Sequence, residues 1–257
     1  MAENKDCEYL EKTKDYWSTR HEGYSNYINE ELNSKKRKIW LDMINRYRPE
    51  GKSLRILDAG CGPGFFPVLL AKEGHHVTAV DYTPQMLETT EQNVNNYGVA
   101  DNVTIKRENL LSLSFDDNTF DMVISRNVTW MVTDPVKVYR EWLRVLKKGG
   151  CFLNFDSNFL FSLYDEELKR QHEINEKEAV KMGYVPTPND HLADGMDKIL
   201  PEFSSASHHR PQWDMENLIN MDFKKITLDK TAYKGLLKGF DEILGRTHRM
   251  FMIKGEK

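Results

Sequence analysis

The stretch Asp58-Ala59-Gly60-Cys61-Gly62-Pro63-Gly64 decides the fold of this chain. A mainly apolar run, residues 54–57, leads into it, and a helix-like segment, residues 65–73, follows it. Glycine accepts positive φ angles and leaves bare backbone for a ligand to approach. Three alternating glycines between a strand and a helix therefore predict a tight turn beneath a bound molecule, toward which the first amide groups of the helix point.

Strand-like and helix-like segments alternate from residue 54 onward. We expect helices at residues 65–73, 84–97 and 135–146, and strands at residues 55–59, 76–80, 103–106, 121–125 and 151–155. This alternation predicts an α/β fold with a Rossmann-like, doubly wound sheet, mostly parallel and covered by helices on both faces. Ligands of such sheets bind beyond the carboxyl ends of the strands. The residues at those ends are Gly60, Asp81, Asn109, Arg126, Asn127 and Asp156.

A helical N-terminal cap, residues 1–50, is expected before the core, residues 51–156. The cap has helical patterns at residues 8–17 and 30–47, and it is rich in aromatic residues: Tyr9, Tyr16, Trp17, Tyr24 and Tyr27. These side chains fit either ordinary packing onto the sheet or a flap that closes over a ligand and excludes water.

Two further parts follow the core. Residues 157–213 are far longer than an ordinary connection, and we expect a lid insertion that begins with a helix at residues 160–182. Residues 214–257 are expected to complete the core sheet. Their pattern predicts a helix at residues 214–221 and an antiparallel edge hairpin of residues 224–228 and 249–253.

Composition excludes several classes of protein. The 257 residues carry a formal net charge of −4 with both signs interspersed, which argues against a nucleic-acid partner. No run approaches the ~20 apolar residues of a membrane span, and the charged first thirty residues do not resemble a signal peptide, so we expect a cytoplasmic protein without a membrane partner. Cys7, Cys61 and Cys151 lack the paired spacing of a disulfide framework or a metal site.

Asp81 is the most informative residue after the glycine turn. It ends the second expected strand at about the twenty-residue spacing at which a carboxylate accepts hydrogen bonds from ribose hydroxyls. A dinucleotide fingerprint G-x-G-x-x-G fails, because its third glycine would fall on Phe65 or Pro67. The two features together indicate a nucleoside-containing ligand that is not a dinucleotide.

Four motifs resemble those of the class I S-adenosylmethionine-dependent methyltransferases. They run from Leu57 to Gly64 (LDAGCGPG), from Val80 to Leu87 (VDYTPQML), from Phe115 to Ser125 (FDDNTFDMVIS) and from Arg140 to Gly150 (REWLRVLKKGG). The resemblance covers residues 54–156 and is specific for fold and cofactor. It implies that S-adenosyl-L-methionine is the cofactor.

The resemblance also implies which residues bind the cofactor. The turn would hold its methionine part, through Asp58, Gly60, Cys61, Gly62 and Gly64, and Asp81 would bind the ribose. Tyr82 and Met86 would flank the adenine, beside Asn109 and Leu110, and Arg126 would lie near the methionine end. Asn109 stands where an aspartate is usual in the family, and its amide oxygen can still accept a hydrogen bond from the adenine amino group.

Candidate catalytic residues lie at the start of the insertion and within it. Asp156 and Asn158 are expected to contact the methyl acceptor, although either could instead cap the following helix. His208 is a candidate base. The histidines His191, His208 and His209 lack the spacing of metal ligands, so no metal is expected.

The sequence therefore predicts a methyltransferase that acts on a small-molecule acceptor in a lidded pocket. A sulfonium methyl group is already activated, so alignment and exclusion of water carry much of the acceleration. Two alternatives from other classes stay open: a non-catalytic protein that binds S-adenosylmethionine or S-adenosylhomocysteine, and an NAD(P)-dependent oxidoreductase. RNA is a further, weaker alternative as acceptor.

Overall fold

A computed structural model describes residues 2–159, 161, 164–185, 199, 205–248 and 250–257. A seven-stranded sheet in the order β3-β2-β1-β4-β5-β7-β6 forms its centre. The strands are β1 (Arg55–Ala59), β2 (His76–Asp81), β3 (Val103–Arg107), β4 (Phe120–Arg126), β5 (Leu146–Asp156), β6 (Lys225–Asp229) and β7 (Phe251–Glu256). Strands β1 to β5 pair in parallel, and β7 runs antiparallel to both β5 and β6. The expected sheet, with its antiparallel edge, is confirmed.

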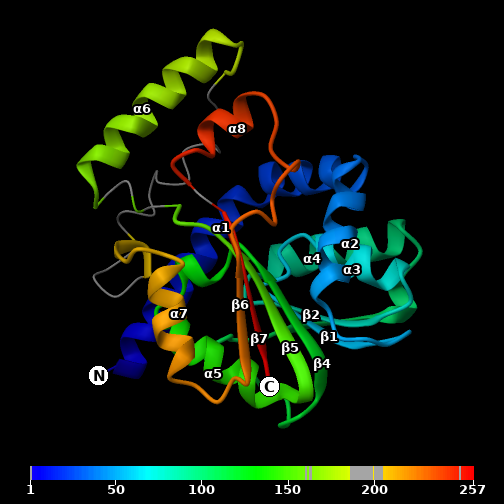
Figure 1. The fold of residues 1–257 in the computed structure, drawn as a ribbon. Helices are drawn as coiled ribbons and strands as arrows, with labels where there is room; N and C mark the ends of the chain where they lie inside the picture. The colour runs from blue at the N-terminus through cyan, green and yellow to red at the C-terminus, as the bar shows by residue number, and fades with distance from the viewer. Residues whose placement is uncertain (1, 160, 162–163, 186–198, 200–204, 249) are drawn as a thin grey trace.

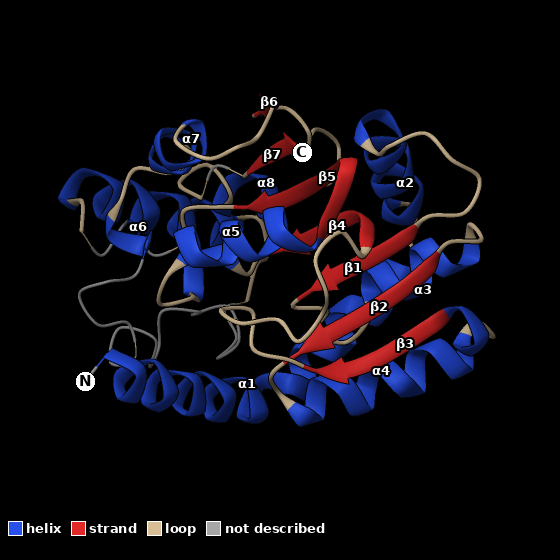
Figure 2. Ribbon diagram, turned by 90° about the horizontal axis from the view of Figure 1, so that it is seen from below, coloured by secondary structure: helices blue, strands red, loops and turns tan. Residues whose placement is uncertain are grey.

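Helices cover both faces of this sheet (Figure 1). They are α1 (Ala2–Leu32), α2 (Lys36–Tyr47), α3 (Phe65–Lys72), α4 (Pro84–Asn96), α5 (Pro135–Val145), α6 (Glu166–Lys181), α7 (Gln212–Ile219) and α8 (Phe240–Leu244). Short 3-10 turns lie at η1 (Ala100–Asn102), η2 (Thr129–Met131) and η4 (Ser205–Ser207). Figure 2 shows α1 as a long helix beside the ends toward which β2 and β3 point.

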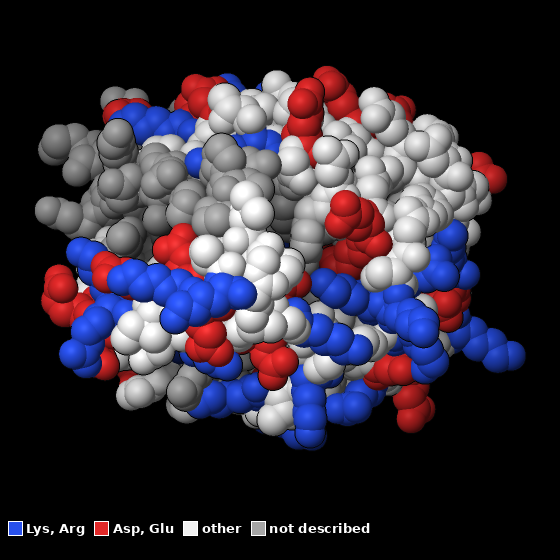
Figure 3. Space-filling model, turned by 90° about the horizontal axis from the view of Figure 1, so that it is seen from above, with Lys and Arg blue, Asp and Glu red and all other residues white. Residues whose placement is uncertain are grey.

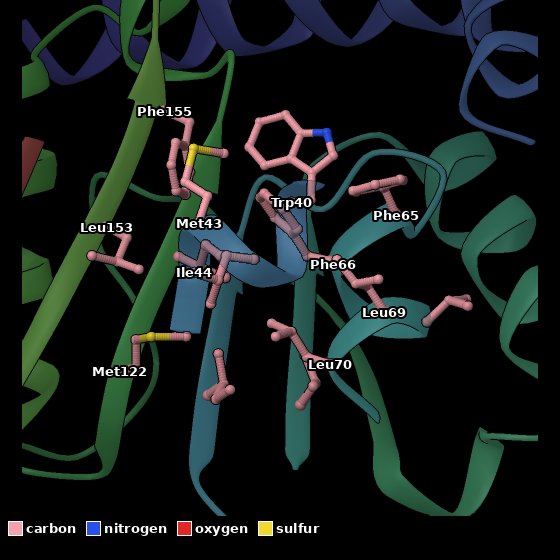
Figure 4. Close-up of a cluster of buried hydrophobic side chains, with 14 of the residues drawn as sticks. Trp40, Met43, Ile44, Phe65, Phe66, Leu69, Leu70, Met122, Leu153 and Phe155 are labelled. Atoms are coloured by element: carbon pink, nitrogen blue, oxygen red, sulfur yellow. The ribbon is translucent and has the colours of Figure 1, made fainter. Parts of the chain in front are cut away.

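Two hydrophobic cores result from the alternation of side chains along the strands. Ile56 of β1 belongs to the core under α2 and α3, whereas its neighbour Leu57 belongs to the core under α5 and α7. Figure 4 shows the first core, in which Trp40 lies between Phe65, Phe66 and Phe155. The ring centroids of Trp40 and Phe155 are 5.1 Å apart at 88°, the edge-to-face geometry that aromatic pairs prefer.

The N-terminal cap differs from the expectation. A single helix, α1, includes all of residues 2–32, and the expected helix over residues 30–47 is interrupted after Leu32. Side chains of this turn bond to the end of α1: Asn33 Nδ2 donates to the carbonyl of Asn29, and Ser34 Oγ donates to that of Glu31. Such local bonds compete with helix continuation, which explains the break without glycine or proline.

The insertion contributes α6, which begins at the N-cap Asp165 rather than near residue 160. Neither Asp156 nor Asn158 caps it. Helix α8 lies in a connection for which we expected no element, and it packs beside α6 (Figure 1). His191 and most of the expected lid loop lie outside the described residues.

Charged side chains of both signs are interspersed over the face drawn in Figure 3. In the part of the chain that the structure describes, no helix has the length and apolar character needed to cross a membrane. The same residues hold no cluster of three or more histidine, cysteine or acidic side chains suited to a metal ion.

Candidate active site

The glycine turn joins β1 to α3 at the carboxyl edge of the sheet. The amides of Gly60 and Cys61 both donate to the carbonyl of Val80, each at 2.9 Å, which ties the turn to β2. Gly60 has a φ of +82°, and a Cβ atom there would lie 2.4 Å from Cγ2 of Val128. Glycine is therefore required at this position both by its backbone conformation and by space.

A cavity of about 790 Å³ opens above this turn. Most of the expected cofactor residues line it: Asp58, Gly60, Cys61, Gly62, Asp81, Tyr82, Met86, Asn109, Leu110 and Arg126. Gly64 is outside the lining and forms the N-cap of α3 with a φ of +90°. The volume lies within the range of pockets that enclose small molecules, and its walls come from the strand ends, α1 and the segment before β7.

Two carboxylates lie at the floor of the cavity. Asp81 accepts hydrogen bonds from the amides of Gly62 (3.0 Å) and Thr83 (2.9 Å), so the turn itself orients it. Asp58 is buried, and its Oδ2 atom has no partner among the described residues. Burial, together with the charge of Asp81, raises the pKa of Asp58 well above its usual value, and burial also raises that of Asp81. A cationic ligand would stabilise the charged form of these carboxylates and lower their pKa values.

Tyr82 and Asn109 form one side of the cavity. The guanidinium of Arg107 lies 4.4 Å from the centroid of the Tyr82 ring, and the Tyr82 hydroxyl donates to Glu11 at 2.9 Å. Asn109 Oδ1 accepts from the amide of Leu111 at 2.9 Å. A carbonyl oxygen has a second lone pair, so Asn109 keeps the capacity to accept a further hydrogen bond.

Arg126 ends β4 and forms a buried ion pair with Glu31 of α1 at 2.6 Å. The indole nitrogen of Trp40 also donates to Glu31 at 3.0 Å. The guanidinium lies 4.6 Å from the centroid of the Trp40 ring. The positive charge of Arg126 is therefore compensated within the protein, and the pair fixes the end of α1 to the sheet.

Helix α1 forms the wall opposite the strand ends. The Tyr9 hydroxyl donates to the carbonyl of Met131 at 2.7 Å, and Ser18 donates to Gln85 of α4 at 2.9 Å. Tyr24 lies against the glycine turn, with its Cε1 atom 3.4 Å from where a Cβ on Gly62 would be. Tyr9, Trp17, Tyr24 and Tyr27 of α1 line the cavity, and Tyr9 and Tyr16 also pack in a buried cluster with Trp130.

A second aromatic wall follows β4. Trp130 donates from its indole nitrogen to the carbonyl of Asn127 at 2.9 Å, and its ring lies 5.2 Å from that of Phe159. His248, in the segment before β7, lies 6.1 Å from Phe159 between ring centroids. Burial and the nearby His172 lower the pKa of His248 to about 4, so its imidazole is neutral near pH 7.

His248 is the functional candidate that sequence reasoning missed. It lies in a connection with no motif, and contacts with Ser157, Phe159 and His172, from distant parts of the chain, place it at the cavity. The sequence signal was its position directly before the last expected strand, residues 249–253.

The three expected catalytic residues lie outside the cavity lining. Asp156 is fully buried and pairs with Arg210 at 3.0 Å. The amide of Asn158 lies against the backbone of His208 and Arg210. His208 is exposed and stacks on Trp213 with ring centroids 4.9 Å apart. Asp156 lies at the end of β5 and is covered by the insertion, to which its pair with Arg210 ties the sheet.

Residues 57–154 match a family model described as a methyltransferase domain. Among curated proteins, a ubiquinone/menaquinone biosynthesis C-methyltransferase from Zymomonas mobilis is 35% identical over 125 residues, covering 49% of this chain and 51% of the relative. A demethylmenaquinone methyltransferase from Lactiplantibacillus plantarum is 37% identical over 98 residues, covering 37% of this chain and 41% of the relative. The chain thus spans about half the length of the curated relatives it matches.

Solved structures share the fold at lower identity. An S-adenosylmethionine-dependent methyltransferase from Mesorhizobium loti aligns with a TM-score of 0.57 and 18% identity, covering 85% of this chain and 97% of that one. Phosphoethanolamine N-methyltransferase 2 from Haemonchus contortus, in complex with S-adenosyl-L-methionine, aligns with a TM-score of 0.59 and 19% identity, covering 84% of this chain and 51% of that one.

Proposed function

Because residues 57–154 form a class I S-adenosylmethionine-dependent methyltransferase domain, with S-adenosyl-L-methionine as its cofactor, we propose that the protein methylates a small, largely apolar molecule inside the cavity. The observation that carries this proposal is the pairing of the glycine turn with Asp81 at the cavity floor.

The residues of the floor fit the groups of the cofactor. The unpaired Oδ2 atom of Asp58 suits the positively charged ammonium of the methionine part, and Asp81 suits the ribose hydroxyls. The adenine would lie between Tyr82 and Met86, with Asn109 and Leu110 at its edge. Bound here, the cofactor supplies an activated methyl group on a sulfonium.

The protein contributes alignment and a dry environment to the reaction. The aromatic side chains of α1 and of the wall after β4 exclude water from the methyl group, and the strand ends fix its direction. The positive sulfonium becomes a neutral thioether during transfer, so aromatic and carbonyl groups near it serve better than a fixed cation. Helix α1 acts as the lid of the pocket in this proposal.

Apolar and aromatic side chains around the acceptor end favour an acceptor with an apolar body. They include Trp17, Trp130, Met131, Phe159 and Met250. The curated relatives named as quinone-biosynthesis methyltransferases agree with an acceptor of this kind. The proposal names an apolar acceptor and no particular quinone, because the matched segments cover only part of each relative.

Titration calorimetry with S-adenosylmethionine tests the proposal. Asp81→Ala removes a charged hydrogen-bond acceptor and should weaken binding by about 10- to 100-fold. Asp101→Ala, on the exposed turn η1, is the matched control and should bind normally. Binding that is unaffected by Asp81→Ala would contradict the proposal. Cofactor binding without release of S-adenosylhomocysteine for any acceptor would instead indicate a binding protein.

A further inference from the structure

Two residues that line the cavity, Trp17 and His248, each carry a buried nitrogen without a hydrogen-bond partner among the described residues. Trp17, on α1, lines the cavity, and its buried indole nitrogen has no hydrogen-bond partner among the described residues. Its ring lies 5.5 Å from that of Tyr24, which rests on the glycine turn. An indole N–H only donates, so the nitrogen of Trp17 offers a hydrogen bond to an oxygen atom of a ligand in this cavity.

His248 provides the second group. Its ring lines the cavity, and its buried Nδ1 atom has no partner in the described part of the chain. Contacts through Phe159 and Trp130 connect it to Asn127 at the end of β4. Asn127 has a φ of +58° and also lines the cavity with an unpaired side-chain oxygen. Side-chain contacts therefore connect Trp17 to the glycine turn and His248 to the end of β4.

The cations of the cavity are already engaged. Among the described lining residues, Lys14 pairs with Glu11, Arg126 pairs with Glu31, and the Arg20 guanidinium lies 4.6 Å from the centroid of the Tyr16 ring. A phosphate or carboxylate on the acceptor would have to compete with these partners and pay its own desolvation. An uncharged acceptor carries no anionic group that must lose its hydration or compete for these cations.

We propose, on the basis of the function above, that the acceptor is an uncharged phenol bound between Trp17 and His248, and that His248 accepts its hydroxyl proton. The aromatic body of a phenol suits the surrounding rings. The phenol oxygen can accept a hydrogen bond from the N–H of Trp17. The phenol hydroxyl can donate a hydrogen bond to Nδ1 of His248.

The proposed step balances in atoms and charge. A lone pair of the phenol oxygen forms the new O–C bond, the C–S bond breaks, and its electron pair goes to sulfur, which leaves a neutral thioether. The hydroxyl proton moves to the imidazole of His248 and then to solvent. A hydroxyl becomes strongly acidic as its oxygen is alkylated, so a neutral imidazole of lowered pKa is a sufficient base.

The test measures S-adenosylhomocysteine release by the full chain with S-adenosylmethionine and three uncharged phenols: 4-methylphenol, 2-methoxyphenol and 1-naphthol. His248→Ala should lower the turnover rate about 100-fold or more, while the Kd for S-adenosylmethionine stays unchanged. Free imidazole added to His248→Ala should restore part of the rate. His76→Ala, at the exposed start of β2, should behave as the wild type with or without imidazole.

Three results would overturn the inference. The first is a wild-type rate with all three phenols that does not exceed the rate without them. The second is a turnover rate of His248→Ala, or of His248→Asn with its more similar side-chain size, that matches the wild type. The third is a lowered turnover rate of His248→Ala that added imidazole does not restore. The proposed function fails on different results: no binding of S-adenosylmethionine, binding that is unaffected by Asp81→Ala, or no release of S-adenosylhomocysteine with any acceptor.

Discussion

At the scale of single residues, the backbone of the glycine turn agrees with what the sequence predicted. Gly60, Gly62 and Gly64 all have positive φ angles, and the position of Asp81 after β2 was expected from spacing alone. Such predictions succeed because they depend on one residue's backbone conformation and on a neighbouring strand end. The catalytic candidates Asp156, Asn158 and His208 lie outside the cavity lining, because their surroundings depend on distant segments.

A comparison of Gly60 with Gly74, which lies outside the glycine turn, separates the cost of backbone strain from the cost of the contact with Val128. Gly60 and Gly74 have nearly equal φ angles, +82° and +84°, yet a Cβ on Gly60 would meet Val128 at 2.4 Å, whereas a Cβ on Gly74 has open space. Gly74→Ala should lower the free energy of unfolding by about 1–2 kcal/mol from strain alone. Gly60→Ala should lower it by about 1–3 kcal/mol more, from overpacking.

Urea unfolding of both variants measures this difference. Cofactor titration should also show weaker binding in Gly60→Ala, because the turn must move away from Val128. Equal losses of unfolding free energy in the two variants would show that the Val128 side chain moves aside without a measurable loss of stability.

At the scale of elements, the strands were predicted closely and α1 was not. Alternation around buried strands is a strong signal, whereas α1 includes Gly23, which costs about 1 kcal/mol in a helix interior and divides the helical pattern. Packing of Tyr9, Tyr16 and Ile28 offsets that cost, and this packing cannot be read from local sequence. The break after Leu32 was missed because it depends on side-chain hydrogen bonds.

The attachment of α1 to the sheet depends on Glu31. Glu31→Gln removes the charge that compensates the buried Arg126, and it should lower the free energy of unfolding by about 3–5 kcal/mol. The exposed pair between Lys38 and Asp42 on α2 is the control, and Asp42→Asn should change stability by less than about 1 kcal/mol. Denaturant unfolding compares Glu31→Gln with Asp42→Asn. Similar small losses of unfolding free energy in both would mean that water reaches Arg126 and compensates its charge once Glu31 is replaced.

At the scale of the whole molecule, one buried network joins the insertion to the sheet. Arg210 pairs with Asp214 of α7 at 2.7 Å and with Asp156 of β5 at 3.0 Å, and all three side chains are fully buried. Thr129 donates to Asp156 and receives from Arg210. The sequence could not predict this network, since its members come from three separate segments and none belongs to a motif.

Arg210→Met leaves two carboxylates buried without a cation. We expect a loss of about 3–5 kcal/mol in the free energy of unfolding, a large share of what a domain of this kind has. Arg246→Met removes a half-exposed pair with Glu178 and should cost less than about 1 kcal/mol. A thermal or urea midpoint for Arg210→Met that equals that of Arg246→Met would contradict the assigned importance of the network.

Helix α1 is attached at both rims of the cavity, to Met131 on one side and to Gln85 and Tyr82 on the other. Breaking some of these bonds would free the helix to move and would widen the way into the cavity for a molecule as large as the proposed cofactor. We therefore expect exchange of the proposed cofactor to depend on movement of this helix.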